Sequence, residues 1–583
     1  MALSSTAAAD YALPIVVLII GAASLVYLFA RNMFAHNGRE PPVAPQAIPV
    51  IGHIVGMERT SFNYYVELSR QMRGAPIFTV PLPGQKMYVV TSPELVQAVQ
   101  KQHRVLAFPP IEAKFAAKIC GTRPETQALM QINVNGDHGD HGLTTQSYMA
   151  MRAALKPGDQ LDDMNRVMIS EIANHHAVRL WPLNPYDDPA VADAFWEFEK
   201  GLMTILVGIL PFITCRKSVA ARNKVAKAFE AYYLAGGVEK GSALARNRYQ
   251  VSVDHGLPLE DIARFEVGGS MAILLNTTPA ALWTLLLLHS HGDGSLLNDI
   301  RAEIDACTET STAADGQTTV KTLDIASLKD SCPLLLSAYQ EVLRYRAMGT
   351  SVREVMEDTH LGPWLLKKGA MLQMPSRVMH QDSSLWGANV DEFYPRRFLA
   401  NEKQHRPRGD VCFRAFGGGK TLCPGRHFAT NEILALVAVF IARFDMKPVG
   451  DNGWKLPTTT NTNVASVIME PDYDVQVDVR TRPGMEGVRW DIGLRKSDKI
   501  FAMIHAASSP EAKAATALVM MSQTEGAAAP AGTVALGASN GTSGSSPANK
   551  NATGVEEERG ASTVEDVEPF RNVWLWEDGN MWT

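Results

Sequence analysis

The segment that most constrains this chain is a cysteine loop, which runs from Phe416 to Ala429 and holds Cys423 between two glycine-bearing turns. A run of residues that predicts a helix, from Ala429 to Phe440, follows directly. Backbone N–H groups in such a turn and the positive end of the following helix lower the pKa of a thiol and favour the thiolate, which binds metal ions. Glycine, which has no Cβ, also lets a flat and bulky cofactor approach the backbone. The loop therefore predicts a cysteine that is held in place for binding.

Three functions are compatible with a cysteine in this setting. A buried structural cysteine in a turn is the simplest. A phosphate-binding loop is suggested by residues 417–421, but its G-x-x-x-x-G-K-T pattern needs glycine at position 414, where the chain has Arg414. An axial haem ligand is the third, and the pattern Phe-x-x-Gly-x-x-x-Cys-x-Gly-x-x-x-Ala favours it. In this pattern the chain resembles the cytochromes P450, which are haem-thiolate monooxygenases.

Length and composition set broad limits. The 583 residues correspond to one large domain or to several ordinary ones. Basic and acidic residues number 55 and 61, so the charge gives no argument for a nucleic-acid partner. Six cysteines lack C-x-x-C spacing, which is not typical of a disulfide framework or a zinc site and favours a reducing compartment. They are Cys120, Cys215, Cys307, Cys332, Cys412 and Cys423.

The N-terminal part predicts attachment to a membrane. Residues 11–30 form an uncharged apolar run of about 20 residues, long enough to cross a bilayer as a helix; a buried helix is the alternative. Asp10 precedes the run and Arg31 and Arg39 follow it, an order that keeps the C-terminal side in the cytosol. We therefore expect a membrane anchor over residues 1–38. The resemblance implies a single-pass protein of the endoplasmic reticulum membrane with its catalytic domain in the cytosol.

The next part of the chain, residues 39–505, predicts one haem domain that is mainly α, of the α+β class with a small sheet region. Helical periodicity dominates from about residue 140 to 350, and a helix is predicted at 92–101. Strand patterns occur at 76–80, 87–90, 352–374 and 466–479. The resemblance implies the cytochrome P450 fold.

Three further segments have distinctive compositions. Prolines between residues 41 and 49 predict a stiff, extended connector between anchor and domain. Residues 202–213 are apolar but too short to span a membrane, so they favour a core helix, with a surface that dips into the bilayer as the alternative. Residues 506–583 are a low-complexity tail that is expected to be disordered.

A helical run at 337–346 places Glu341 and Arg344 three residues apart, on one helix face. Taken alone, such a pair is most often a solvated contact worth about 0.2–0.5 kcal/mol. Here a Pro-x-Arg-Phe segment containing Arg397 follows, ahead of the cysteine loop, and this order resembles the family's Glu-x-x-Arg helix and its partner segment. The resemblance implies a buried structural network of these charged residues that supports the loop. Removal of one partner would cost roughly 3–5 kcal/mol.

A long apolar helix is predicted from about Leu259 to His289, and the resemblance implies that it crosses the distal face of the haem. Pro279 lacks an N–H group, so we expect a kink that leaves room beside Thr277 for dioxygen and a water; an ordinary proline kink is the alternative. The hydroxyls of Thr277 and Thr278 are expected to relay protons in catalysis.

The same helix departs from the common family pattern. Ile273 and Leu274 replace a small pair of residues, and Asn276 replaces an acid. Asn276 is the third residue expected at the catalytic face, although an amide does not take up or donate a proton as a carboxylic acid does. The segment resembles the branch that contains sterol 7α- and 12α-hydroxylases and prostacyclin synthase, some of which hydroxylate while others rearrange a peroxide.

The resemblance also implies the cofactor and the residues that bind it. Haem b is expected, with Cys423 as the axial ligand of its iron and with Phe416, Gly417 and Gly425 forming the loop around that ligand.

Two arginines are expected to bind the haem propionates. Arg353 matches a family position that often does so, and Arg152 fits a Trp-x-x-x-Arg helix in which Tyr148 replaces tryptophan. Thr421 stands where the family often has arginine or histidine, which raises the importance of Arg353 and Arg152. A surface position is the alternative for either arginine.

The expected reaction is insertion of one oxygen atom from O2 into an apolar organic substrate, such as a terpenoid, a sterol or a polyketide. Electrons would come from NADPH through NADPH–cytochrome P450 reductase. Two alternatives follow from the unusual distal helix. One is a haem-thiolate isomerase or dehydratase that needs no reductase. The other is a haem-binding protein without turnover, in which Leu274 blocks the oxygen site.

Overall fold

The computed structural model describes residues 37–48, 51–173, 184–208, 211–402, 410–450, 453–463 and 465–494. It also describes Gly21, Pro407 and two short strands, β13 (Trp576–Glu577) and β14 (Asn580–Met581). Apart from these positions, the predicted anchor at 11–30 and the predicted tail at 506–583 lie outside the described residues.

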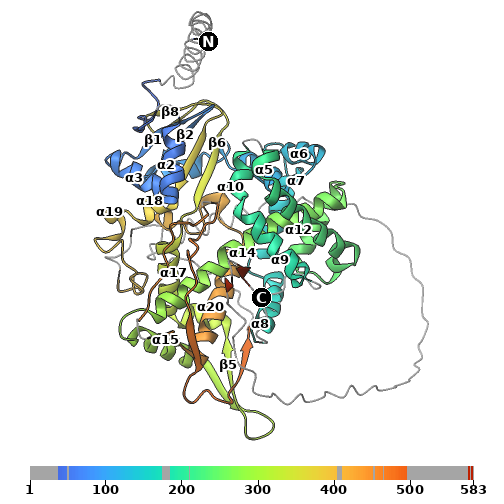
Figure 1. Cartoon of the computed structure of the whole chain (residues 1–583), viewed down its shortest axis with the longest axis vertical. Helices are drawn as coiled ribbons and strands as arrows, with labels where there is room; N and C mark the ends of the chain where they lie inside the picture. Colours follow the sequence, from blue (N-terminus) through green and yellow to red (C-terminus); the bar gives the residue numbers. More distant parts are fainter. Residues whose placement is uncertain are drawn as a thin grey trace, which may run out of the picture.

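Helices make up most of the domain (Figure 1). They are α2 (Gly52–Thr60), α3 (Tyr64–Gln71), α4 (Pro93–Lys101), α5 (Pro109–Cys120), α6 (Pro124–Gln131), α7 (Leu143–Leu155), α8 (Asp159–Ala173), α9 (Pro189–Lys200), α10 (Leu202–Val207), α11 (Pro211–Thr214), α12 (Arg216–Leu234), α13 (Ala243–Asp254), α14 (Leu259–His289), α15 (Ser295–Ala306), α16 (Ile325–Ser331), α17 (Pro333–Arg346), α18 (Ser376–His380), α19 (Ser383–Trp386) and α20 (Arg426–Arg443).

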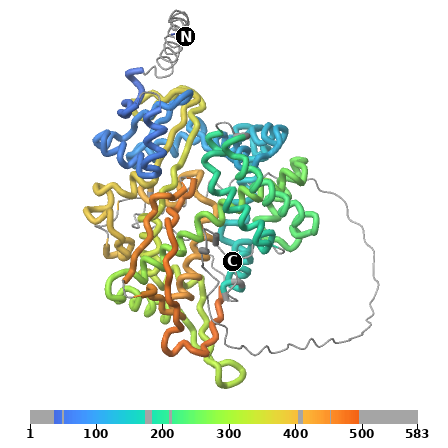
Figure 2. Tube along the Cα trace, viewed as in Figure 1, coloured from blue at the N-terminus to red at the C-terminus, as the bar shows by residue number. Residues whose placement is uncertain are grey.

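The largest sheet has five strands in the order β1-β2-β9-β6-β3. Its strands are β1 (Ile77–Leu82), β2 (Gln85–Val90), β9 (Met371–Pro375), β6 (Thr350–Val355) and β3 (Leu106–Ala107). Only the β2–β9 pair is parallel. Figure 2 shows the early strands beside β6 and β9, which come much later in the chain. The sheet therefore joins the start of the domain to residues 350–375, which lie much later in the chain.

Smaller sheets complete the fold. One combines the hairpin β4 (Thr308–Thr312) and β5 (Thr319–Asp324) with β12 (Arg489–Gly493), which runs parallel to β5. The others pair β10 (Phe444–Pro448) with β11 (Val477–Thr481) and β7 (Thr359–Leu361) with β8 (Trp364–Leu366). The architecture is mainly α with small segregated sheets, as predicted.

Helix α14 crosses the middle of the molecule and packs against α5, α12, α17 and α20 (Figure 1). Glu260 and Asp261 lie in its first turn, where negative charge complements the helix dipole. Its bounds match the predicted ones, and the helix continues without a break through Pro279. Among the described residues it is the one helix long and apolar enough to cross a membrane, but 56% of its apolar stretch is buried, as in a core helix.

Some local predictions were wrong. The hairpin of β4 and β5 lies inside the stretch that we expected to be helical. Of the strand expected at 466–479 only the end, in β11, is a regular strand. The proline-rich connector was predicted only as stiff and extended; in the structure it is also held in place, because Val43 forms a bridge with Thr79 and the Ala44 N–H donates to the Thr79 carbonyl at 2.9 Å. The connector is therefore docked on β1.

Candidate active site

The cysteine loop is a closed turn that ends in a helix. The Cys423 N–H donates to the Phe416 carbonyl at 2.9 Å, which closes the turn. Gly417 and Gly419 have φ values of 77° and 63°, a left-handed conformation in which other residues are strained. Gly425 is the N-cap of α20, which begins earlier than the predicted Ala429. The sulfur thus lies at the N-terminus of a buried helix.

The charge environment of Cys423 differs from our expectation. Burial raises the pKa of the Cys423 thiol, and this effect outweighs the N–H groups of Gly425 and Arg426 and the positive charge of Arg426, which lower it. The prediction of a lowered pKa was therefore wrong for the free thiol. A metal cation reverses this balance, because a coordinating thiol is deprotonated outright. The backbone N–H groups then stabilise the thiolate.

Side chains from two other elements hold the loop. Tyr148, on α7, donates its hydroxyl to the Lys420 carbonyl at 3.0 Å. Arg353, on β6, donates from Nη2 to Thr421 Oγ1 at 2.6 Å, and the Thr421 hydroxyl donates to the Gly418 carbonyl at 3.1 Å. From the sequence we expected Thr421 only to lack the cation that the family often has at this position. In the structure Thr421 connects the loop to Arg353.

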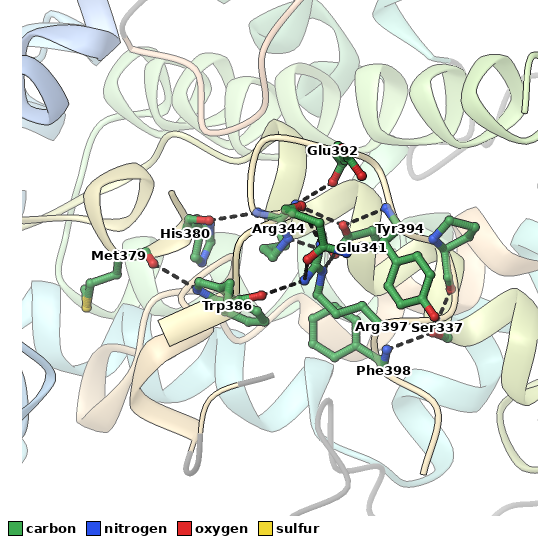
Figure 3. Close-up of polar contacts among 12 residues, drawn as sticks. Ser337, Glu341, Arg344, Met379, His380, Trp386, Glu392, Tyr394, Arg397 and Phe398 are labelled. Carbon is green, nitrogen blue, oxygen red and sulfur yellow. Dashed lines mark hydrogen bonds and ion pairs between the residues drawn. The ribbon is translucent and has the colours of Figure 1, made fainter. Parts of the chain in front are cut away.

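The predicted charged network is present and fully buried (Figure 3). Arg344 donates from Nε and Nη2 to the two carboxylate oxygens of Glu341 at 2.8 and 2.9 Å, and Arg397 Nε donates to the same carboxylate at 2.9 Å. All three side chains are at most 1% exposed. Backbone carbonyls of Trp386 and His380 accept further bonds from Arg397 and Arg344 at 2.8 Å each. The network is a confirmed structural prediction.

His380 connects this network to the cysteine loop. Its carbonyl accepts from Arg344, and its Nε2 accepts from the Arg414 N–H at 2.9 Å. Burial and the neighbouring arginine charges lower the pKa of His380 to about 3, so the ring is neutral at pH 7 and Nε2 is free to accept. A neutral histidine therefore links the charged network to the segment that leads into the cysteine loop. The sequence analysis did not identify this role of His380.

The distal helix presents the predicted polar residues in two different ways. The Thr277 hydroxyl donates to the Ile273 carbonyl at 2.9 Å, within α14. The Asn276 amide donates to the Ala272 carbonyl at 3.1 Å, and its oxygen accepts from the Val467 N–H at 3.3 Å. Asn276 thus joins α14 to the loop before β11. Thr277 and Thr278 are both half-buried.

The arginines expected at the haem lie in different surroundings. Arg353 is 4% exposed and lies over the ring of Phe108, with 5.5 Å from its Cζ to the ring centre. Arg152 is exposed and lies over Tyr148 at 5.1 Å. Arg414, which served in the sequence only to exclude a phosphate loop, is 3% exposed and lies close enough to Arg353 to lower its own pKa. The family often has a basic residue at the position of Thr421. Its absence from this sequence was the signal that could have identified Arg414 as a replacement.

These residues fit a haem. Arg414 Nε and Nη1 are buried without a hydrogen-bond partner among the described residues, so a hydrogen-bond acceptor fits beside them, and an anion also balances the charge. Haem has carboxylate side chains of that kind, an iron that takes a cysteine thiolate, and a flat ring that suits a glycine-rich loop.

Comparisons with known proteins identify the family. The family model for cytochrome P450 matches residues 272–477. A cytochrome P450 monooxygenase of Hypoxylon pulicicidum, nodJ, is 34% identical to the chain over 84% of this chain and 99% of the relative.

The chain is a cytochrome P450.

Other relatives agree with this assignment. A cytochrome P450 monooxygenase of Gibberella zeae is 27% identical over 82% of this chain and 95% of the relative. A cyanobacterial P450 with bound retinoic acid, CYP120A1, shares the fold, with a TM-score of 0.54 and 16% identity over 76% of this chain and 100% of that structure.

Membership of the family establishes a haem-thiolate monooxygenase and does not favour the isomerase or the non-catalytic alternative. Cytochromes P450 generally receive electrons from a redox partner and act on apolar substrates. Fungal members are commonly anchored in the endoplasmic reticulum membrane.

Proposed function

We propose that this P450 hydroxylates an apolar organic substrate with electrons from NADPH, delivered by NADPH–cytochrome P450 reductase, and that Cys423 is the ligand of its haem iron. The loop around Cys423 carries this proposal. It combines a cysteine at a helix N-terminus, a turn closed by the Phe416 carbonyl, and a buried charged network behind it. A purely structural cysteine needs no such support.

The residues that hold haem come from three elements in this proposal. Phe416, Gly417 and Gly425 would shape the loop that holds the haem, and Arg353, on β6, would bind a propionate. Arg152, on α7, is the second propionate partner expected from the sequence; its exposed position over Tyr148 gives it less support than the burial of Arg353. Bound haem supplies the reductive activation of O2 and the transfer of one oxygen atom.

Thr277 is the proton-relaying residue in this proposal. Its hydroxyl already donates to the Ile273 carbonyl, and its oxygen keeps acceptor capacity for a water. A hydroxyl that both donates and accepts passes a proton without a change of charge. Thr278 is the second hydroxyl of this face. Asn276 acts by position, because its amide joins α14 to the Val467 N–H and carries no transferable proton.

Membrane attachment rests on the anchor at 11–30 and on exposed apolar side chains of the domain. Four of these side chains, between 44% and 47% exposed, lie in the proline-rich connector and around the start of α2: Val43, Ile48, Ile51 and Ile54. Val207 and Ile213, at the ends of α10 and α11, are 58% and 65% exposed, which supports a surface that dips into the bilayer. We place the domain on the cytosolic face of the endoplasmic reticulum membrane, over residues 39–505, with a tail from residue 506.

The substrate class follows from the same picture. An apolar substrate dissolved in the bilayer suits an anchored enzyme, and terpenoids, sterols and polyketides are the classes that we favour. Half-buried Ile273 and Leu274 give the distal helix apolar side chains near Thr277.

The test is product analysis with purified reductase, NADPH and a panel of such substrates. Hydroxylated products that require both reductase and NADPH would support the proposal. Rearranged products that form without reductase would point to an isomerase instead, and a chain that binds haem but yields no product from any substrate would point to a binding protein. Cys423→Ser serves as the negative control, because it removes the proposed ligand.

A further inference from the structure

Arg414 is a buried cation in an unusual setting. Its guanidinium donates from Nη2 to Ser351 Oγ at 3.0 Å, while Nε and Nη1 are buried without a hydrogen-bond partner among the described residues. A Cβ placed on Gly418 would lie 3.1 Å from Nη1, so the loop backbone passes directly beside the guanidinium. Arg414 therefore lies between β6 and the cysteine loop. Its Nε and Nη1 remain available to donate to a ligand.

The charges around Arg414 do not balance it. Burial and the positive charge of Arg353 lower the pKa of Arg414 to about 10, and the neighbouring Cys412 thiol opposes this only in part. Glu112 acts on Arg353 but is not among the groups that act on Arg414. Both arginines stay protonated at pH 7, so two buried positive charges lie side by side. Such an arrangement is stable only with an anion between or beside them.

The hydroxyls of the site orient the two guanidiniums. Ser351 accepts from Arg414 and Thr421 accepts from Arg353, and each hydroxyl takes up only one nitrogen of its arginine. The backbone of Arg414 is fixed as well, because its N–H donates to His380. The hydroxyl at position 421 thus holds Arg353 in place, whereas a cation at position 421 would repel the Arg353 guanidinium.

We propose that Arg414 binds one carboxylate of the haem and supplies the positive charge that Thr421 lacks. This inference rests on the proposed haem site. The positive charge thus comes from a residue nine positions before Cys423 instead of two, and Arg414 would bind the carboxylate together with Arg353.

The test compares holoenzyme variants by the rate at which haem transfers to a scavenging apoprotein and by the reduction potential. Arg414→Met should accelerate haem loss about 10- to 100-fold, the range expected for a hydrogen bond to a charged group, and should shift the potential to more negative values. Arg414→Lys, which keeps the charge, should lie between Arg414→Met and the native chain.

Arg377→Met is the matched control. Burial lowers the pKa of Arg377 to about 10 as well, but Arg377 is half-buried and donates to Asn63 Oδ1 at 2.8 Å. We expect its haem loss and potential to stay near native values. Equal haem loss in both methionine variants, or haem loss in Arg414→Lys as fast as in Arg414→Met, would overturn the proposal and leave Arg414 a packing residue. If Cys423→Ser retains the thiolate spectrum, the haem site itself is misassigned.

An independent observation concerns two thiols where the end of α15 meets the start of α17. The sulfurs of Cys307 and Cys332 lie 3.4 Å apart, and both cysteines are free. Cys307 is half-buried at the end of α15, while Cys332 is fully buried at the N-cap of α17. The Glu303 carboxylate accepts from the N–H groups of Leu334 and Leu335 and keeps the two helix ends together.

We infer that Cys307 and Cys332 form a redox-active pair that closes to a disulfide with a small-molecule disulfide as oxidant. The accessible Cys307 thiolate attacks the small disulfide and releases one thiol, and a mixed disulfide remains at Cys307. Cys332 then attacks the Cys307 sulfur, loses its proton and releases the second thiol. Two protein thiols are oxidised by two electrons, and one disulfide is reduced to two thiols.

The test incubates the haem-loaded chain with glutathione disulfide and maps peptides by mass spectrometry without reduction. We expect a linked peptide pair containing Cys307 and Cys332. In Cys332→Ser, glutathione should instead accumulate on Cys307, and in Cys412→Ser, a buried cysteine outside the pair, the link should still form. Stable glutathione on Cys307 of the native chain, or no reaction there, would refute the inference.

Discussion

Arg397 and its neighbour Arg396 offer a sharp test of the charged network. Arg397 is 0% exposed and donates to the Glu341 carboxylate, the Trp386 carbonyl, and the side chain and carbonyl of Asn389 at 2.8–3.0 Å. Glutamine at this position cannot reach all of these acceptors. Their buried oxygens would be left without donors, so we expect Arg397→Gln to cost roughly 3–5 kcal/mol of unfolding free energy.

The adjacent substitution Arg396→Gln is the matched control. Arg396 pairs with Asp299, but the two side chains are 42% and 55% exposed, so water competes for both charges. An exposed pair of this kind is worth about 0.2–1 kcal/mol. The two variants change the same residue type by the same substitution at consecutive positions. Their difference, about 3 kcal/mol, corresponds to roughly a 100-fold difference in the unfolding equilibrium.

The assay is guanidinium unfolding of the haem-loaded protein, followed by circular dichroism and by the haem absorbance. If unfolding is irreversible, the half-life of the haem absorbance at a fixed temperature replaces the equilibrium value. Because total stabilities of 5–15 kcal/mol are usual, Arg397→Gln should remain partly folded but lose haem early. Equal destabilisation by the two variants, within about 0.5 kcal/mol, would show that the buried network does not support the domain.

Three further outcomes are expected. Cys423→Ser should abolish the thiolate-type spectrum of the reduced carbon monoxide complex, and an unchanged spectrum would contradict the ligand assignment. Thr277→Ala should lower the rate of product formation by roughly 100-fold or more, the usual contribution of a positioned proton donor, while NADPH consumption continues; a product yield per NADPH equal to the native one argues against the relay. Burial raises the pKa of Glu470 to about 7, with a contribution from the negative charge of Glu199. A raised carboxyl pKa favours the folded state at low pH, so this stability should be lost as the pH rises through 7, and melting temperatures of Glu470→Gln should vary less than native ones between pH 5 and 8.

Local patterns predicted the elements whose sequence signal is local. Helix α14 has a long apolar stretch with acids in its first turn, and its bounds follow from the sequence alone. The hairpin of β4 and β5 escaped prediction for the opposite reason. Its first strand, the Thr- and Ser-rich β4, is largely exposed and shows no alternation of apolar residues. The parallel partner of β5 is β12, far along the chain. The turn residues Asp315 and Gly316 were the one local signal.

The candidate site also has a part that the sequence predicts and a part that depends on the tertiary fold. Cys423 and the network of Glu341, Arg344 and Arg397 are recognisable by spacing. Contacts that depend on folding were not predictable.

Three results show this limit. The Asn276 amide reaches Val467 across the fold, and burial outweighs the N–H groups at the Cys423 thiol. Arg414 lies next to Arg353 only because β6 passes beside the cysteine loop. In each case the sequence supplies the group and the tertiary fold decides its partner.

The docked connector limits how the domain can face a bilayer. Thr79 holds both Pro42 and Ala44 by backbone hydrogen bonds, so the chain leaves the five-stranded sheet at a fixed point. If a membrane span ends at Ala30, the eleven steps to Pro41 reach at most about 40 Å even when fully extended. The sheet end of the molecule must then stay near the membrane, and the hairpin of β4 and β5, at the other end in Figure 1, points towards the cytosol. A short tether of this kind restricts the orientation of the domain at the membrane. It therefore determines which face of the enzyme a lipid-dissolved molecule reaches first.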